Sequence, residues 1–267
     1  MAAPSSSPAI RRRFEAADDV LAAAAELAMR LRPPPGAPAA IEKGAQDWVT
    51  EADRAVEALV SERIATLFPA DGFAGEEAGS ARQGALRWVI DPIDGTSNYA
   101  RGRARWCVSL GLLEGNEPVA GWIVAPVLGE RFAALRGAGA TLDGRPIRVS
   151  DVSDPNRAMI EIGWSPRTGN ERFLGVAGRA MAAGAMPRSG GSGALALADI
   201  ACGRLDGYVE ISINLWDVAG ALPILAEAGA VVSPFLRDGG LHRAIPIVAA
   251  TPGLADAMGA IAGIATG

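Results

Sequence analysis

The stretch WVIDPIDGTSNY, residues 88–99, constrains the fold more than any other part of the chain. A short apolar run ends there in two acids, Asp91 and Asp94, with a proline between them and Gly95-Thr96 directly after. This pattern predicts one small turn in which carboxylates lie beside free backbone N–H groups, an arrangement suited to a metal ion and a phosphate. An Asp-Pro pair can also simply begin a turn, and an acid can cap a helix, so the stretch alone leaves these interpretations open.

Composition narrows the class of protein. The chain has 267 residues, of which 49% are hydrophobic and 21% charged, as in a globular protein with a large core in one domain or two lobes. Its 25 basic and 30 acidic residues give a formal charge of −5, which disfavours nucleic acid as the main partner because a phosphate backbone needs a basic face. An anionic small substrate would have to be attracted by bound cations rather than by the overall field.

The rare reactive side chains exclude several mechanisms. Cys107 and Cys202 are far apart and not at metal-ligand spacing, so we expect no disulfide framework and a cytoplasmic protein. We also expect no membrane partner, because no apolar run reaches the roughly 18 residues that a spanning helix needs. The single histidine, His242, follows a Gly-Gly pair typical of a surface loop. Catalysis is therefore expected to depend on carboxylates, hydroxyls and metal rather than on imidazole.

The apolar patterns predict two lobes. Residues 1–9 carry no periodic signal and are expected to be flexible. Residues 10–150 are expected to form an N-terminal α+β lobe, with helices over 10–31 and 50–67, an acidic loop over 71–79, and strands over 87–90, 107–113, 119–125 and 130–136. This lobe would carry the metal and phosphate site.

Residues 151–267 are expected to form a C-terminal α/β lobe that completes the active site, because strand and helix patterns alternate there. The expected strands cover 158–163 and 207–211 and lie near Val231 and Ile247; the expected helices cover 169–183, the segment before 202, 216–228 and the segment from 252, with a glycine-rich turn at 189–193. Pro223 lies inside one expected helix and predicts a kink.

Four acidic places carry the candidate chemistry: Asp53, Glu76-Glu77, Asp91 with Asp94, and Asp217. Each also has a purely structural interpretation. Asp53 completes the helix-capping pattern Thr50-x-x-Asp53, the paired glutamates can lie in a solvated loop, and Asp217 can cap the helix that follows it. Carboxylates that converge from different elements would suit Mg²⁺, which prefers oxygen ligands.

Together these places resemble the inositol monophosphatase family of magnesium-dependent, lithium-sensitive phosphatases. Residues 88–98 resemble the first family signature, Trp216–Gly220 with Glu227–Gly229 resemble the second, and Asp47–Asp53 with Gly75–Glu77 are similar to the block before the first. The resemblance covers roughly residues 43–260. It implies a layered αβαβα sandwich of the sugar-phosphatase type, shared with fructose-1,6-bisphosphatase, and a homodimer.

The resemblance also implies a role for each matching residue. One Mg²⁺ would be held by Glu76, Asp91 and the Ile93 carbonyl, a second by Asp91, Asp94 and Asp217, and a weaker third by Glu76 and water. Asp53 and Thr96 match the pair that orients and deprotonates the attacking water, with Glu76 counted among the catalytic residues. The backbone N–H groups of Gly95 and Thr96 would bind phosphate, and Ser192, Glu210 and Asn214 fall where substrate contacts occur.

The activity implied is hydrolysis of a small polyol phosphate, above all myo-inositol monophosphate, by metal-activated water. The substrate inference depends on Glu210, because an acid can accept hydrogen bonds from ring hydroxyls, although it can equally contact an amino group or cap a strand. Related enzymes for histidinol phosphate, fructose 1,6-bisphosphate or 3'-phosphoadenosine 5'-phosphate are the alternatives. A second alternative is a non-catalytic regulatory or binding protein, against which the retained acids and Thr96 argue.

The segment Asn98–Trp106 departs from the family pattern. It lacks the His and Pro that members often carry and has Arg101, Arg103 and Arg105 instead. We interpret it as a solvated basic loop, with contact to a second phosphate or to product as the alternative.

Overall fold

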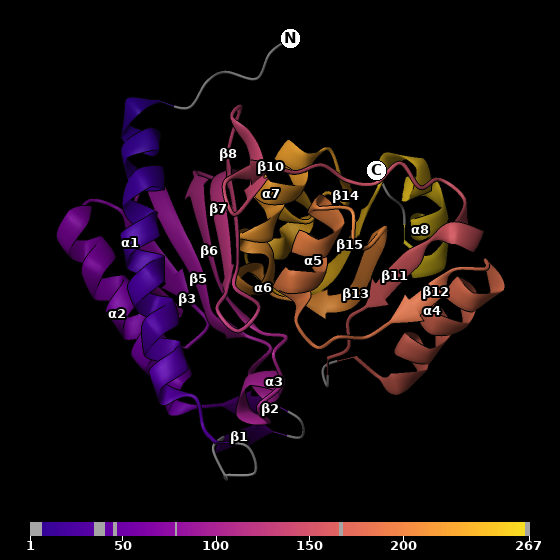
Figure 1. The fold of residues 1–267 in the computed structure, drawn as a ribbon, viewed down its shortest axis with the longest axis horizontal. Helices are drawn as coiled ribbons and strands as arrows, with labels where there is room; N and C mark the ends of the chain where they lie inside the picture. Colours follow the sequence, from indigo (N-terminus) through magenta and orange to yellow (C-terminus); the bar gives the residue numbers. More distant parts are fainter. Residues whose placement is uncertain (1–6, 35–40, 45–46, 78, 166–167, 265–267) are drawn as a thin grey trace.

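The computed structural model describes residues 7–34, 41–44, 47–77, 79–165 and 168–264, and arranges them in alternating layers of helix and sheet (Figure 1). Helices α1 (Pro8–Leu31) and α2 (Glu51–Leu67) pack on one face of a large sheet. Helices α5 (Gly193–Ala201), α6 (Leu215–Ala219) and α7 (Ala221–Ala228) lie between this sheet and a smaller one. Helices α4 (Asn170–Ala182) and α8 (Ala255–Ala262) cover the outer face of the smaller sheet.

The large sheet has the strand order β10-β9-β8-β7-β6-β5-β3-β4 within the described residues. Its strands are β3 (Gly72–Gly75), β4 (Gly79–Arg82), β5 (Leu86–Asp94), β6 (Cys107–Glu114), β7 (Glu117–Ala125), β8 (Glu130–Leu135), β9 (Gly139–Leu142) and β10 (Arg145–Pro146). Neighbouring strands are antiparallel except β3 and β5, which run parallel with Gly75 opposite Ile90. The turn after β3 therefore lies beside the end of β5, at one edge of the sheet.

The smaller sheet has the order β12-β11-β13-β15-β14. Its strands are β11 (Met159–Ile162), β12 (Met186–Arg188), β13 (Gly207–Ile213), β14 (Val231–Val232) and β15 (Ile245–Ala250). β11 runs parallel to β12 and β13, and the remaining pairs are antiparallel. Single turns of 3₁₀ helix cover Pro155–Arg157 and Pro252–Leu254, and a π-type turn covers Leu236–Gly240.

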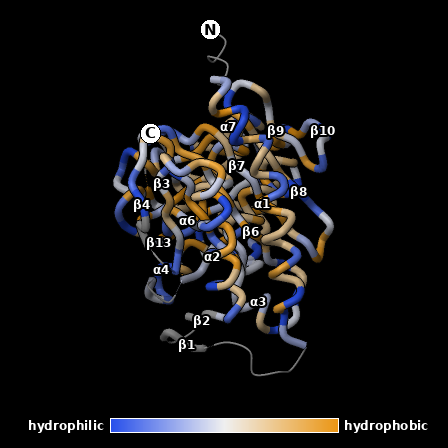
Figure 2. Tube along the Cα trace, turned by 90° about the vertical axis from the view of Figure 1, so that its left-hand side faces the viewer, coloured by the Kyte–Doolittle hydropathy of each residue, from blue (hydrophilic) through white to orange (hydrophobic). Residues whose placement is uncertain are grey.

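The two sheets share one hydrophobic core. Ile123 of β7, Leu197 of α5, Leu225 of α7 and Ile247 of β15 belong to the same buried cluster. Figure 2 shows hydrophobic segments gathered in the middle of the molecule and hydrophilic ones at its outer loops. Residue 150 thus falls between two sheets that are packed together through α5–α7. Among the described residues, no helix combines the length and apolar character that a bilayer crossing requires.

Two paired glycines let the α6–α7 connection approach the large sheet closely. Gly111 on β6 lies opposite Gly121 on β7. A Cβ at Gly111 would meet the backbone of Ala219, and one at Gly121 would meet the carbonyl of Gly220. This close packing of backbone on backbone holds α6 against β5 and β6, which brings the second signature to the first.

Several elements differ from the sequence-based expectation. α1 begins at Pro8, so residues 8 and 9 are helical; residues 1–6 lie outside the described part. β3 and the start of β4 lie within the segment expected to be an acidic loop. These strands were not predicted, because their short glycine-containing segments show no period-two pattern. The helix expected over 216–228 is two helices that meet at Gly220. Pro223 is then the third residue of α7, where a missing N–H breaks no bond within the helix.

Candidate active site

The N-terminus of α2 fixes the carboxylate of Asp53. The backbone N–H and the hydroxyl of Thr50 both donate to Asp53 Oδ2, at 2.8 and 2.5 Å. The other oxygen, Oδ1, accepts a hydrogen bond from Thr96 Oγ1 at 3.3 Å. Asp53 is only 1% exposed, so this geometry is held by the fold. The capping and functional interpretations of Asp53 are therefore compatible, because each uses a different oxygen.

The end of β5 bends at the two first-signature acids. The register between β5 and β6 shifts between Asp91 and Asp94, which accommodates the proline that cannot join the ladder. The Ile93 N–H donates to Asp91 Oδ1 at 3.0 Å, and Thr96 Oγ1 lies 3.0 Å from the Ile93 carbonyl oxygen. Gly95 has φ +92°, and a Cβ there would press on the carbonyls of Gly191 and Arg105. The turn into α3 (Thr96–Ala100) therefore requires glycine.

Asp94 is tied to the start of α5 from the other lobe. Its Oδ2 accepts a hydrogen bond from the Ser192 hydroxyl and one from the Ala194 N–H at 2.9 Å, and Oδ1 accepts one from the Gly193 N–H at 3.3 Å. The predicted substrate residue Ser192 is 3% exposed, and its hydroxyl is engaged with Asp94. Ser192 therefore orients an acid of the site and also lines the cleft, and its contact with substrate stays a prediction.

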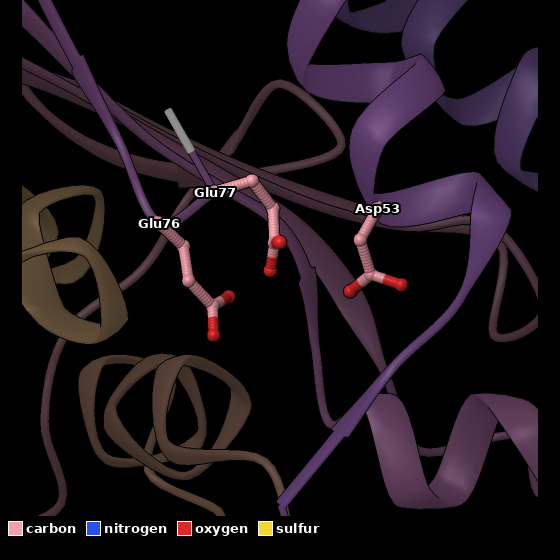
Figure 3. A group of neighbouring side chains, drawn as sticks. All are labelled: Asp53, Glu76 and Glu77. Carbon is pink, nitrogen blue, oxygen red and sulfur yellow. The ribbon is translucent and has the colours of Figure 1, made fainter. Parts of the chain in front are cut away.

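The structure brings the acids together as two groups. Carboxylate oxygens of Asp53, Glu76 and Glu77 lie within 4.8 Å of one another, and so do those of Asp91, Asp94 and Asp217. Figure 3 shows Glu77 between Glu76 and Asp53, with both glutamates extending from the turn after β3. Glu77 was not assigned a role from the sequence, although its place beside Glu76 in Gly-Glu-Glu was a visible signal.

Burial and mutual repulsion raise the pKa values of these acids. Burial raises the pKa of Asp91 well above its usual range, and the charge of Glu76 adds to this, followed by those of Asp94 and Asp217. Burial raises the pKa of Asp94 to about 6, although the Ser192 hydrogen bond opposes the shift. Burial also raises the pKa of Asp53 against the Thr50 hydrogen bonds. Carboxylates this close and this buried need a cation to ionise together.

A second buried acid on α2 supports the turn that carries Glu76. Glu57 lies one helical turn after Asp53 and is 3% exposed. Its Oε2 accepts the Glu77 N–H at 2.9 Å, and a Cβ at Gly75 would occupy the place of its carboxylate. Glu57 therefore connects α2 to the Glu76-Glu77 turn. Glu57 is not among the residues predicted from the sequence, although its four-residue spacing from Asp53 places both acids on one helix face.

The acids open onto a cleft of about 400 Å³. Glu210 and Asn214, which the sequence predicts to contact substrate, line this cleft together with Glu76, Asp94, Thr96 and Asp217. Glu210 is 9% exposed, and its Oε2 accepts a hydrogen bond from the Tyr208 hydroxyl at 2.5 Å. Burial and the neighbouring Glu210 charge raise the pKa of Tyr208 well above its usual value, so its hydroxyl stays a donor.

The three arginines of the Asn98–Trp106 segment have different surroundings, and the interpretation as a solvated loop is wrong for Arg105. Arg105 donates to Glu161 Oε2 at 2.9 Å and to Asp199 Oδ2 at 2.8 Å. Arg103 is exposed and lines the cleft, with its guanidinium donating to Asn98 Oδ1 at 2.9 Å. Arg101 is exposed to solvent.

The Arg105 ion pairs hold the glycine-rich turn over the cleft. Glu161 Oε1 accepts the Gly190 N–H at 2.9 Å, while the Asn98 side-chain amide donates to the carbonyls of Gly190, at 2.8 Å, and Arg105, at 2.7 Å. The turn runs directly into Ser192 and so into the contacts of Asp94. Residues 98–105 are thereby connected to residues 161 and 190 beside the site.

Replacing Arg105 by methionine is expected to lower the free energy of unfolding by about 2–4 kcal/mol, because the buried charge of Glu161 would lose its partner. Urea unfolding measures the change. The matched control is Arg101→Met, which removes an exposed charge and should cost no more than about 0.5 kcal/mol. Adding Glu161→Gln to Arg105→Met should recover part of the loss. Equal losses of stability in Arg105→Met and Arg101→Met would contradict the assignment of Arg105 as the partner of Glu161.

Comparisons with known proteins bear on the family and the fold of the chain. The model of the inositol monophosphatase family matches residues 11–263. The chain is 41% identical over 198 residues to "Nus factor SuhB" of Xylella fastidiosa, covering 73% of this chain and 72% of that one. It is 40% identical over 200 residues to "Inositol-1-monophosphatase" of Synechocystis, covering 73% and 69%. The crystal structure of extragenic suppressor protein suhB from Bartonella henselae superposes with TM-score 0.86 at 27% identity, covering 94% and 98%. The layered fold expected from the sequence is confirmed.

Proposed function

Because the chain belongs to the inositol monophosphatase family, we propose that it is a cytoplasmic, magnesium-dependent phosphomonoesterase that hydrolyses a small polyol phosphate, most closely myo-inositol monophosphate. The observation that carries the proposal is the presence of two acidic groups, one of Asp53, Glu76 and Glu77 and one of Asp91, Asp94 and Asp217. Their raised pKa values and all-oxygen donor set fit hard divalent cations.

Two cation positions form part of the proposal. Asp91, Asp94 and Asp217, whose carboxylates converge, would hold one Mg²⁺. The family resemblance implies that Glu76, Asp91 and the Ile93 carbonyl hold the other, and the charge of Glu76 acts on Asp91. Glu77 lies close enough to Glu76 to contribute to a weaker third position. Bound Mg²⁺ lowers the pKa of a water and neutralises charge on phosphate and leaving oxygen.

Asp53 and Thr96 would orient and deprotonate the attacking water. The Thr96 hydroxyl can donate to Asp53 Oδ1 while its lone pairs accept a hydrogen bond from the water. As the water oxygen bonds to phosphorus, the bond between phosphorus and the ester oxygen breaks. The water proton passes to the Thr96 oxygen, the hydroxyl proton passes to Asp53, and the departing alkoxide takes a proton from a solvent water. The raised pKa of Asp53 brings it closer to that of an efficient base at neutral pH. The N–H groups of Gly95 and Thr96 would face the phosphate.

The polyol would occupy the part of the cleft lined by Glu210 and Asn214. Glu210 lines the cleft, so its carboxylate could accept a hydrogen bond from a ring hydroxyl of the substrate, beside the Tyr208 hydroxyl that donates to Oε2. Arg103 is the only cationic side chain lining the cleft within the described residues. It is therefore the residue to which a second phosphate, as in fructose 1,6-bisphosphate or 3'-phosphoadenosine 5'-phosphate, would bind.

The test is a substrate panel. The purified protein with Mg²⁺ is assayed on myo-inositol monophosphate, histidinol phosphate and the two bisphosphates, and kcat/KM is compared. We expect the inositol ester to be the best of the four. If it is the poorest, the substrate assignment is wrong, and a preference for the bisphosphates that disappears in Arg103→Met would point to the alternative.

A second candidate function is regulatory. It is favoured by the similarity to a relative named "Nus factor SuhB", which is as strong as the similarity to a named phosphatase. Such a protein would act through partner binding and would need no turnover. Absence of hydrolysis on every ester with Mg²⁺ would favour it.

The proposal also includes two properties that the family resemblance implies. The protein forms a homodimer, which light scattering after size exclusion measures directly. Lithium inhibits turnover by competing for the second cation position, which a lithium titration at several Mg²⁺ concentrations would show.

A further inference from the structure

A second hollow lies beside the reaction cleft. This hollow has a volume of about 490 Å³ and is lined by Trp164, Asn170, Phe173, Leu174 and Ser189. Trp164 and Ser189 also line the cleft that holds the acidic groups. The hollow therefore lies beside the cleft, with Trp164 and Ser189 common to the linings of both.

The Trp164 side chain is exposed, and a hydrogen bond fixes its orientation. Its side chain follows β11 and is 41% exposed, an unusual exposure for the largest apolar side chain. The indole N–H donates to Asn170 Oδ1 at 3.2 Å, which fixes the ring against the start of α4. Phe173, which is half-buried, and Leu174, which is 64% exposed, give the hollow an apolar surface beside Trp164.

The apolar side chains of the hollow do not match the hydroxyl groups of a polyol. The cleft beside it is lined by acids and small polar residues, which match hydroxyl groups and cations. An exposed indole next to Phe173 matches instead a flat, apolar group, since aromatic rings stack on one another with little loss of conformational freedom.

We infer that Trp164, Phe173 and Leu174 form a subsite for an aromatic ring on the alcohol part of a phosphate ester whose phosphate lies at the acidic groups. The inference rests on the proposed phosphatase function. It extends the substrate range to phosphate esters of aryl-substituted alcohols, for which Trp164 is a specificity-determining residue.

The test compares two alkyl phosphates, 2-(2-naphthyl)ethyl phosphate and glycerol 2-phosphate, in the wild-type protein and in Trp164→Ala. We expect the variant to lose about tenfold in kcat/KM for the naphthyl ester and to stay within about twofold for glycerol 2-phosphate. Trp164→Phe should lose only about threefold for the naphthyl ester because it keeps a ring. Saturation-transfer NMR with 2-(2-naphthyl)ethanol gives a second readout, which should weaken in Trp164→Ala.

Leu128→Ala is the control, because Leu128 is 43% exposed like Trp164 but lines neither space. Equal losses of kcat/KM for both esters in Trp164→Ala overturn the subsite. A molecular mass of Trp164→Ala that is half that of the wild-type protein also overturns it, because Trp164 would then be buried between two copies of the chain. If the wild-type protein hydrolyses neither ester, the proposed function fails instead. Turnover of glycerol 2-phosphate with an unchanged preference in Trp164→Ala refutes the subsite alone.

Discussion

Asp91→Asn is expected to lower kcat/KM by at least about 10³-fold, which corresponds to roughly 4 kcal/mol of transition-state stabilisation. Asp91 belongs to one acidic group and is faced by Glu76 of the other, so both proposed cation positions depend on it. The amide is nearly the same size and can still accept the Ile93 N–H. Steady-state assays over a wide range of Mg²⁺ concentration measure the loss.

The same substitution is expected to stabilise the metal-free protein. Asp91 is 2% exposed, and burial together with four neighbouring carboxylates raises its pKa, so its ionised form is unfavourable in the fold. A neutral amide removes that penalty, and we expect the thermal midpoint at pH 7.5 without metal to rise. The control is Asp151→Asn, which changes an exposed acid in a loop. A variant that keeps wild-type turnover would refute the two-cation assignment, and one with a lowered metal-free midpoint would refute the repulsion.

The arrangement of the first signature was predictable because its residues are close together in the sequence. Asp91, Asp94 and Gly95-Thr96 lie within one turn, so their residue types alone indicate carboxylates beside backbone N–H groups. The cap at Thr50 and Asp53 was also visible, since capping depends on a three-residue spacing. What the local pattern could not show is that Asp53 uses one oxygen for the cap and points the other at Thr96, 43 residues away.

The remaining site residues depend on pairings that leave no local trace. Glu76 and Glu77 reach Asp91 and Asp53 because β3 runs parallel to β5, yet β3 is a four-residue strand with two glycines. Arg105 illustrates the same limit. Its charge suggests solvent, whereas its partners Glu161 and Asp199 lie 56 and 94 residues further along the chain. Charge patterns predict exposure only when no distant acid is brought near.

Without metal, lowering the pH from 7.5 to about 5 is expected to raise the stability of the protein. Asp94 has an ordinary pKa of 3.8 and a folded-state pKa of about 6, so between these values the folded protein binds a proton that the unfolded chain has released. The free energy of unfolding therefore falls as the pH rises through this window. From pH 7.5 to 5 this group contributes roughly 1.4 kcal/mol, because pH 5 lies about one pH unit below its folded-state pKa. The raised pKa values of Asp91 and Asp53 act in the same direction.

With saturating Mg²⁺ the dependence is expected to reverse. The cation binds the same carboxylates that the protons occupy, so its apparent affinity falls as the pH decreases. At a concentration of about 100 times its dissociation constant, a ligand stabilises the folded state by roughly 2.7 kcal/mol, and this contribution is largest at pH 7.5. Thermal midpoints measured from pH 5 to 8, with EDTA or with Mg²⁺, should therefore diverge as the pH rises.

The divergence distinguishes a metal site from a buried acidic core. If the acids were only structural, the thermal midpoints with EDTA and with Mg²⁺ would change in parallel with pH, because Mg²⁺ would not compete with protons for these carboxylates. Asp91→Asn provides the matched control within the site. It removes the shared ligand and one of the repelling charges, so its metal-free midpoint should depend less on pH, and Mg²⁺ should raise it little. Divergence in the wild-type protein that persists unchanged in this variant would place the responsible cation elsewhere.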